Sequence, residues 1–169
     1  MTTFDVRTVK LRSGEQFRDV RQIELQPFEL GGERYLPVPE EPEASFTMSR
    51  VTSGLLFELA FEARLAGPCF RCLADAHVAT VVHAQEYHAT SPVDADELRT
   101  PYLADDRLDL SAWARDAVAL ALPDQILCRA DCAGLCAGCG VDLNSEACVC
   151  PPPEPDARWA KLAEVKERL

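Results

Sequence analysis

The segment from Cys128 to Cys150 holds six of the eight cysteines in this 169-residue chain. It contains a C-x-x-C-G motif, a loop with the turn formers Asp, Asn and Ser, and a C-x-C motif. Zinc binds thiolates tetrahedrally, and a C-x-x-C that faces a C-x-C across a short loop makes a closed set of four ligands. We expect Gly140 to let backbone N–H groups approach the sulfur atoms without a Cβ clash. The sequence therefore predicts a zinc site, here called site 1, made of Cys136, Cys139, Cys148 and Cys150.

The other four cysteines also add up to one site. Cys69 and Cys72 form a separate C-x-x-C motif. Cys128 and Cys132 are four residues apart, so one helical turn would put both sulfur atoms on the same face. We predict a second four-thiolate centre, called site 2, from these four residues, and so two zinc ions per chain, both bound only by cysteine. Two other interpretations stay open: Cys69 and Cys72 as small buried apolar side chains, or a single zinc ion with ligands from both groups.

Disulfide bonds are the main alternative use of an even number of cysteines. The N-terminal residues, MTTFDVRTVK, are charged and polar, with neither the apolar segment nor the cleavage pattern of a secretory signal. We therefore expect a cytoplasmic protein, and in a reducing cytoplasm such clusters favour metal over disulfides. A thioredoxin-type redox pair at Cys69 and Cys72 is not favoured, because the residues after Cys72 are β-rich, where that motif needs a helix.

The composition indicates a globular protein, with 47% hydrophobic and 27% charged residues in a length that fits one domain with a small appendage. No run of 18 apolar residues occurs, so we expect no membrane-spanning segment. The formal net charge of −11 argues against a general basic surface for nucleic acid and favours basic partners such as ribosomal proteins. Phosphate-binding and hydrolase motifs are absent, and no small-molecule substrate is expected.

The clearest strand pattern covers residues 55–65, where apolar residues alternate with charged ones. This period of two predicts a half-buried antiparallel strand that runs into Gly67-Pro68-Cys69, so the first C-x-x-C lies at a turn. Residues 77–88 are β-rich and are expected to return beside it as a hairpin. Residues 91–107 are predicted to form a polar, acidic loop.

A helix is predicted over about residues 110–122, with Trp113 on its buried apolar stripe. Asp109 or Ser111 can cap its start, and Pro123 ends it. A second, short helix after Asp156 needs a surface to dock on, and it either packs on the domain or forms an arm toward a partner.

These patterns together predict an α+β fold: an antiparallel β-rich domain with one packed helix, a cysteine-rich zinc-ribbon-like segment and a C-terminal helix. We assign residues 1–127 to the β-rich domain and residues 128–150 to the zinc-binding segment. Residues 151–169 are a Pro-rich spacer followed by the terminal helix.

An ordered series of short motifs runs along nearly the whole chain. It comprises Ser13-Gly14-Glu15, Cys69-Phe70-Arg71-Cys72-Leu73, Glu86-Tyr87, Leu108-Asp109-Leu110, Ala119-Leu120-Ala121-Leu122-Pro123, the run from Leu127 to Gly140, Asp142-Leu143-Asn144 and Pro155-Asp156-Ala157-Arg158. The series resembles the YceD family of large ribosomal RNA subunit accumulation proteins, most specifically between Cys128 and Asn144. The resemblance implies a bacterial, cytoplasmic protein with a role in large-subunit ribosomal RNA accumulation or maturation, and hence in ribosome assembly. It also implies an association with a zinc-ribbon ribosomal protein of the large subunit, and it supplies no catalytic residues.

We therefore favour a non-enzymatic assembly factor whose zinc sites make loops rigid and whose surface binds ribosomal RNA or a basic large-subunit ribosomal protein. Arg71 and Arg129 are the candidate phosphate contacts, although an Arg beside thiolates can simply offset their charge. The alternatives are a zinc-stabilised protein–protein adaptor without RNA contact, and an enzyme, either a metal-dependent nuclease or a thiol oxidoreductase. Zinc with four thiolate ligands has no open position for water, which argues against hydrolysis.

Overall fold

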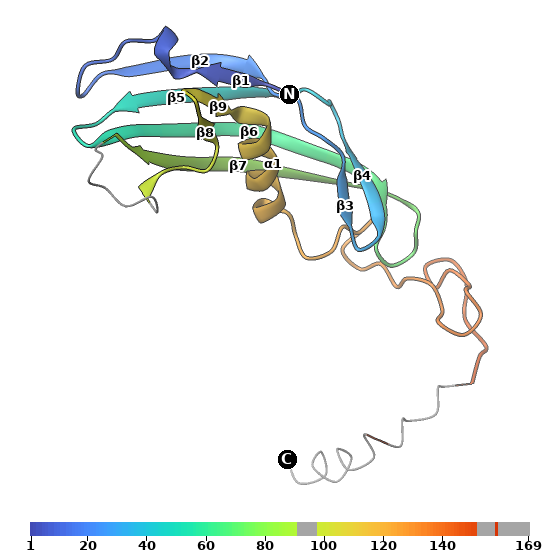
Figure 1. Cartoon of the computed structure of the whole chain (residues 1–169). Helices are drawn as coiled ribbons and strands as arrows, with labels where there is room; N and C mark the ends of the chain where they lie inside the picture. Colours follow the sequence, from blue (N-terminus) through green and yellow to red (C-terminus); the bar gives the residue numbers. More distant parts are fainter. Residues whose placement is uncertain (91–97, 152–157, 159–169) are drawn as a thin grey trace. The chain divides into compact units, whose positions relative to one another are not determined.

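A hairpin of two long strands lies at the centre of the first part of the chain. Our computed structural model describes residues 1–90, 98–151 and 158, and the chain divides into two compact units, Met1–Cys132 and Ala133–Leu169. In the first unit, β6 (Gly54–Pro68) and β7 (Asp75–Ala89) pair in antiparallel register over all 15 residues of each strand (Figure 1). The hairpin expected from residues 55–65 and 77–88 is present, and both strands extend beyond the predicted ranges.

The other strands widen this hairpin into a six-stranded sheet and add a small three-stranded one. The large sheet has the order β2 (Gln16–Gln22), β5 (Glu43–Arg50), β6, β4 (Glu33–Pro37) and β3 (Phe28–Leu30), and β7 pairs with the remaining side of β6. The small sheet has the order β1 (Thr3–Asp5), β9 (Arg107–Asp109) and β8 (Leu103–Ala104). All strand pairs within the described residues are antiparallel.

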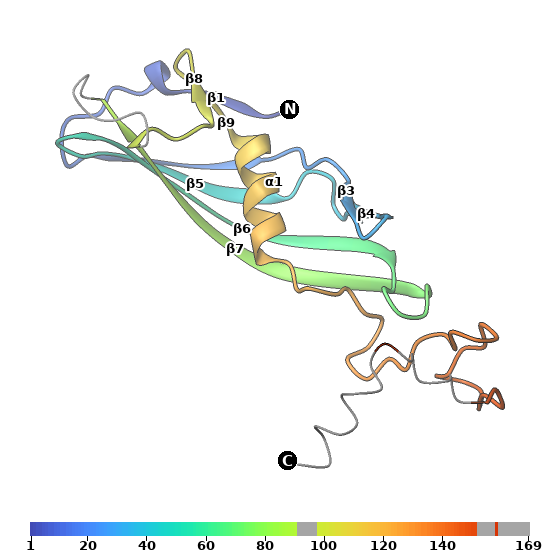
Figure 2. The same ribbon diagram turned by 60° about the horizontal axis from the view of Figure 1, so that its bottom comes forward.

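The helix α1 (Leu110–Ala121) covers one face of the large sheet where β6 and β7 run, as Figure 2 shows from a second direction. The Asp109 side chain caps it by accepting a hydrogen bond from the Ala112 N–H at 3.0 Å. Leu122 is already extended, as the residue before Pro123 tends to be, so α1 ends one residue before the predicted position. Trp113 is buried on the inner side of α1, as its place on the apolar stripe predicts.

The core of the first unit lies between the sheet and α1. The alternation of β6 buries every second side chain on this face: Phe57, Leu59, Phe61, Ala63 and Leu65. A short 3-10 helix (Val6–Thr8) interrupts the N-terminal segment. The Asp5 side chain caps this helix by accepting a hydrogen bond from the Arg7 N–H at 3.0 Å. The expected fold class is confirmed: in the described residues the chain is antiparallel and β-rich, with one main helix and two groups of cysteines.

Residues 91–107 are not wholly a loop, because β8 and the start of β9 form a tight antiparallel pair. The turn between them is Asp105-Asp106, and both residues adopt positive φ angles of 49° and 62°, which Asp tolerates better than most residues.

The predicted terminal helix lies outside the described residues. The three-part division into domains stays a prediction, and the structure separates its two units after Cys132. We find no helix in the described ranges with the length and apolar character that a membrane crossing requires.

Candidate metal centres

The turn between β6 and β7 positions the first two cysteines of site 2. The Cys69 N–H donates to the Ala74 carbonyl at 2.7 Å, and the Leu73 N–H donates to the Cys69 carbonyl at 3.0 Å. Leu73 has a positive φ of 61°, which lets the chain reverse directly after Cys72. Cys69 and Cys72 are therefore held at the hairpin tip by the backbone of the turn itself.

The segment after α1 brings the other two cysteines of site 2 to this tip. The Phe70 N–H donates to the Ile126 carbonyl at 2.8 Å, which ties the segment to the hairpin before Cys128 begins. The predicted helical turn is absent: Cys132 N–H donates to the Arg129 carbonyl at 3.2 Å, three residues back, in a turn. Sequence reasoning had no signal for the Phe70–Ile126 contact, because it joins backbone atoms that are distant in the chain.

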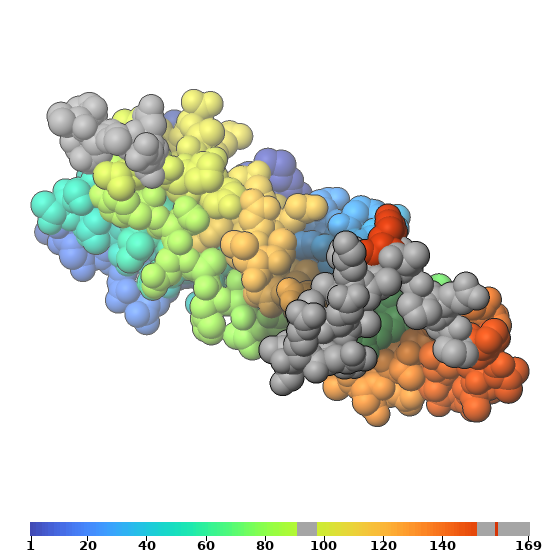
Figure 3. Space-filling view, turned by 90° about the horizontal axis from the view of Figure 1, so that it is seen from below, coloured from blue at the N-terminus to red at the C-terminus, as the bar shows by residue number. Residues whose placement is uncertain are grey.

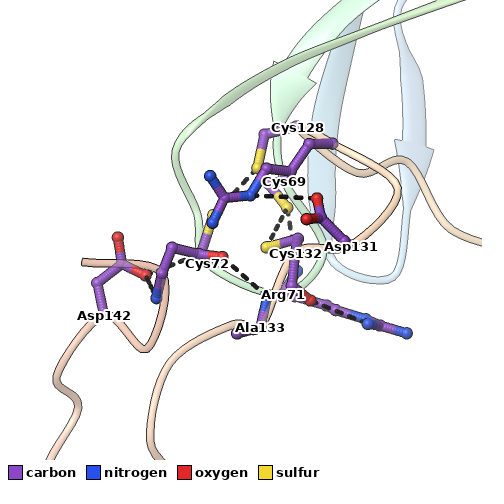
Figure 4. A network of polar contacts seen from close by, with 10 residues as sticks. Cys69, Arg71, Cys72, Cys128, Asp131, Cys132, Ala133 and Asp142 are labelled. Atoms are coloured by element: carbon purple, nitrogen blue, oxygen red, sulfur yellow. Dashed lines mark hydrogen bonds and ion pairs between the residues drawn. The ribbon is translucent and has the colours of Figure 1, made fainter. Parts of the chain in front are cut away.

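The four sulfur atoms of site 2 form one group, with all four within 4.8 Å of one another (Figure 4). The Cys69 and Cys132 sulfur atoms are 3.8 Å apart, and those of Cys72 and Cys128 are 3.6 Å apart. A tetrahedral ion with metal–sulfur bonds of about 2.3 Å places its sulfur ligands about 3.8 Å apart. Cys69, Cys72 and Cys132 are buried, and Cys128 is exposed. The group can hold a metal ion without rearrangement of the hairpin.

The electrostatics of site 2 favour an added cation. Burial opposes ionisation of Cys69, but N–H groups of Cys128, Cys72 and Arg71 outweigh it and lower the pKa of this thiol to about 6. The hydrogen bond with Cys72, together with burial, raises the pKa of Cys128 to about 12. Four thiols this close do not ionise together in the absence of a positive ion, because each thiolate disfavours the next. A bound divalent cation would remove this conflict.

Site 1 lies in the second unit and is built on a small backbone framework. The Cys136 N–H donates to the Val141 carbonyl and the Gly140 N–H to the Cys136 carbonyl, both at 2.8 Å. The Leu143 N–H donates to the Gly134 carbonyl at 2.9 Å. These bonds close the first knuckle and set the direction of the loop that leads to the C-x-C motif.

The four sulfur atoms of site 1 also lie within 4.8 Å of one another. Cys148 is 3.2 Å from Cys136 and 3.7 Å from Cys139, measured between sulfur atoms. N–H groups of Cys139 and Gly138, with the Cys148 thiol, lower the pKa of Cys136 to about 6. Hydrogen bonds with Cys148 and Cys139 raise the pKa of Cys150 to about 12. Site 1 therefore has the same pattern as site 2, in which the pKa of one thiol is lowered and that of another is raised.

The glycines of the knuckle have different roles from the expected one. Gly140 has a φ of 75°, and a Cβ atom there would meet nothing within 4 Å, so the position needs glycine for its backbone conformation. Gly138 is the residue whose N–H approaches a sulfur atom, that of Cys136, at 3.4 Å. A Cβ atom on Gly138 would lie 3.4 Å from the Cys150 sulfur. The close approach to sulfur thus belongs to the glycine inside the motif.

The loop between the two halves of site 1 is held by Asn144. Its side-chain oxygen accepts from the Ala133 N–H at 2.8 Å, and its backbone N–H donates to the Asp142 carboxylate at 2.9 Å. This is an Asx-type turn, which agrees with Asp and Asn as turn formers in the sequence. The specific link from Asn144 back to Ala133 is a tertiary feature that spacing alone does not reveal.

The two candidate phosphate contacts lie beside site 2. Arg71 is exposed, and its guanidinium donates to the Cys132 carbonyl at 3.0 Å (Figure 4). The Arg129 Nε is 3.4 Å from an Asp131 carboxylate oxygen. Both arginines therefore make contacts within site 2 itself, and their contact with RNA stays a prediction.

The fold and these two groups define the class: a β-rich chain with two sets of four cysteines that can hold metal ions. A family model described as "Large ribosomal RNA subunit accumulation protein YceD" matches residues 57–166, a range that includes all eight cysteines. This chain belongs to the YceD family.

Relatives at moderate identity come from mycobacteria. Uncharacterized proteins of Mycobacterium bovis and Mycobacterium tuberculosis are each 36% identical over 122 residues, which cover 68% of this chain and 57% of theirs. An uncharacterized protein of Mycobacterium leprae is 36% identical over 106 residues, which cover 57% of this chain and 46% of the relative. The chain thus spans about half the length of these curated relatives. No solved structure matches it significantly.

Proposed function

We propose that this protein is a zinc-binding, non-enzymatic factor in large-subunit ribosomal RNA accumulation and maturation, and that it acts in the cytoplasm during ribosome assembly. The observation that carries the proposal is the convergence of all eight cysteines into two groups of four, in a member of a family described by large ribosomal RNA subunit accumulation. Both groups consist of soft thiol ligands only, which suits zinc and not the oxygen-seeking magnesium or calcium ions.

Zinc in these sites would be structural. Cys69, Cys72, Cys128 and Cys132 would hold one ion, and Cys136, Cys139, Cys148 and Cys150 the other. With four protein ligands each, neither ion offers a position for a water nucleophile, which supports a role in shaping the surface over a role in hydrolysis. At site 2 the ion would lock the segment after α1 onto the hairpin tip.

The surface beside site 2 is the candidate contact with RNA. Four thiolates on one Zn²⁺ carry a formal charge of −2, and the two arginines offset part of it. Arg71 keeps an exposed guanidinium that can also meet a phosphate. The net charge of −11 supports a second candidate, an adaptor that binds a basic large-subunit ribosomal protein without RNA contact.

Metal content is the first test. Protein purified without added metal should contain two zinc ions per chain by elemental analysis, because each group supplies a complete ligand set. Cys136→Ser or Cys139→Ser should release one ion and lower the melting temperature, and Cys69→Ser should release the other. Metal-free protein with disulfide-bonded sulfurs, or unchanged zinc in these variants, would contradict the assignment.

Function is tested in the organism that encodes the chain. Deletion of the gene for this chain, or its replacement by the double variant Cys69→Ser/Cys136→Ser, should lower the ratio of large-subunit to small-subunit ribosomal RNA. Binding to large-subunit RNA fragments that weakens with salt and with Arg71→Ala would favour the RNA contact, whereas binding to basic ribosomal proteins alone would favour the adaptor. RNA cleavage that persists in pure protein, with or without Mg²⁺, would overturn the non-enzymatic role.

A further inference from the structure

The outer edge of β7 pairs with no other strand in the described part of the chain. Two backbone bonds continue the β6–β7 register at its ends: Cys69 N–H to the Ala74 carbonyl and Thr90 N–H to the Ser53 carbonyl. Hydrogen-bonded pairs alternate in an antiparallel ladder, so the even-numbered residues of β7 bond to β6. The N–H and C=O groups of the odd-numbered residues therefore point away from β6. Among the described residues no strand pairs with this side.

The β7 strand itself lacks several of the usual features that protect an edge against strand addition. Natural edge strands are shortened, bulged, or carry Lys or Pro, because a free row of N–H and C=O groups is a template for another chain. β7 is 15 residues long, keeps one register throughout, and contains neither Lys nor Pro. Such an edge either binds a partner or is an aggregation hazard.

The middle of this edge lies in a groove that suits a single extended peptide. A hollow of about 460 Å³ lies between β7 residues 81–86 and α1, and Figure 3 shows this side of the molecule. Its lining includes the backbone of β7 around Val81, 65% exposed, together with Ala117, Ala121 and Leu120 of α1, the last 89% exposed. Six strand residues extend about 20 Å, and a partner strand of that length can bond to β7 while its side chains contact α1.

The charge of the groove selects the partner. Its lining contains the acidic residues Asp116 and Glu86 and no Lys or Arg. Asp116 accepts a hydrogen bond from the Tyr102 hydroxyl at 3.0 Å and lies 3.9 Å from Arg115, while the chain as a whole carries −11. A second copy would bring another −11 to this surface, whereas a basic segment is attracted to it.

We propose that the β7 edge and α1 form a docking site for an extended, basic peptide segment of a partner protein, which adds to the large sheet as a further strand. The proposal rests on the proposed function in one respect: it gives a binding mode for the basic ribosomal partner. The backbone of the added strand supplies affinity through bonds to β7, and small apolar side chains that alternate with Lys or Arg supply selectivity.

The test uses the full-length, zinc-loaded chain and a fluorescent ten-residue peptide in which Lys and Val alternate, followed by fluorescence anisotropy. The peptide should bind, and its counterpart with Glu in place of Lys should not. Two further peptides carry N-methyl groups on all Lys or on all Val residues, with the charge unchanged. A strand shows alternate N–H groups to its neighbour, so one methylated peptide should bind as the parent does and the other should lose binding. Equal binding of both would show simple charge attraction and overturn the proposal.

Variants of the chain locate the site. Val81→Pro removes only an outward N–H and should weaken binding roughly fivefold or more. The matched control is Val20→Pro on edge strand β2, where the N–H donates to the Asp19 side chain and not to β5, and this variant should bind normally. Leu120→Arg should weaken binding of the basic peptide, and Leu120→Glu should not. Because Leu120 is 89% exposed, both variants should fold, and their folding and zinc content serve as a check.

The remaining outcomes are also decisive. Wild-type affinity in both Val81→Pro and Leu120→Arg would overturn the docking site. Dimerisation of the full chain that Val81→Pro abolishes would also overturn it, because a second copy would then occupy the edge. Peptide binding that occurs only after residues 152–169 are removed would overturn it as well. Failure of the docking site leaves the ribosomal RNA ratio in the cysteine variants as an independent measure of the proposed function. Conversely, a normal ratio in the deletion strain with intact peptide binding would reject that function alone.

Discussion

Gly67 shows how one residue decides the position of site 2. A Cβ atom at this position would lie 2.4 Å from the Tyr35 ring, closer than any real contact. Tyr35 is 2% exposed, and its hydroxyl donates to the Pro68 carbonyl at 2.8 Å, directly before Cys69. The absence of a side chain at Gly67 therefore lets an aromatic ring support the end of β6 where the first cysteines begin.

We predict that Gly67→Ala destabilises the first unit by about 1–3 kcal/mol, because the added methyl group forces the Tyr35 ring or β6 to shift. Thermal or urea denaturation of the protein as purified measures this change. A Tyr35→Leu background supplies the control, because it removes the ring that the methyl group meets. An equal effect of Gly67→Ala in both backgrounds would show that the clash is not the cause.

At the same scale, the structure distinguishes the two cap candidates of α1. Asp109 accepts from the Ala112 N–H, whereas the Ser111 hydroxyl accepts from the Thr2 N–H at 2.8 Å and so ties the N-terminus to α1. Asp109→Ala should lower the free energy of unfolding by about 1 kcal/mol, while Asp109→Asn should largely preserve it. Denaturant titration of both variants checks this. A loss of equal size in the Asn variant would mean that charge, not capping, is what Asp109 contributes.

At the scale of elements, Tyr102 links the segment before β8 to α1. Its hydroxyl bonds to Asp116, and burial together with this carboxylate raises the pKa of Tyr102 to about 12. A pKa above the unfolded value of about 10 means that the folded state prefers the neutral phenol. The contribution of Tyr102 to stability is therefore complete below about pH 10 and is lost as the pH rises toward 12.

Tyr102→Phe should remove this part of the pH dependence. We expect the stability of the wild-type chain to fall more steeply than that of the variant between pH 10 and 12, in denaturant titrations at several pH values. In the variant, absorbance at the tyrosinate band should lose a group that titrates well above the usual range of tyrosine. Parallel stability curves for the two proteins would show that Tyr102 titrates normally.

At the scale of the whole molecule, the two units differ in what stabilises them. The first unit has a continuous apolar core that includes Trp113, Phe46, Phe57 and the buried cysteines of site 2. In the second unit the described residues contribute no hydrophobic side chain to the buried core. A segment this small, without a core, needs a metal ion or a comparable cross-link to keep one structure.

Metal removal should therefore affect the units unequally. On treatment with a strong chelator under reducing conditions, NMR signals of residues 133–151 should move to random-coil positions, while the amides of β5, β6 and β7 stay dispersed. Re-addition of zinc should restore the spectrum. Unchanged shifts of Asp142 and Asn144 after complete metal loss would show that the loop folds without an ion.

The cysteine spacing, the period-two pattern of residues 55–65 and the apolar stripe on residues 110–122 were sufficient to predict the antiparallel hairpin, the packed helix and two groups of four cysteines. The patterns behind these predictions are local, because hydrophobic periodicity and short motif spacing act over a few residues. The turns at Asp105-Asp106 and at Cys128–Cys132 were missed, since the first looks like an acidic loop and the second like a helical turn by spacing alone.

The amino-acid sequence by itself determined which residues are buried along each strand and which sulfur atoms belong to tight turns, because both depend on neighbours in the chain. Tertiary structure alone decided that Phe70 meets Ile126, that Gly67 lies against Tyr35 and that α1 packs beside β7. Each of these brings together residues whose sequence separation carries no signal, and only the packing of the sheet and helix places them in contact.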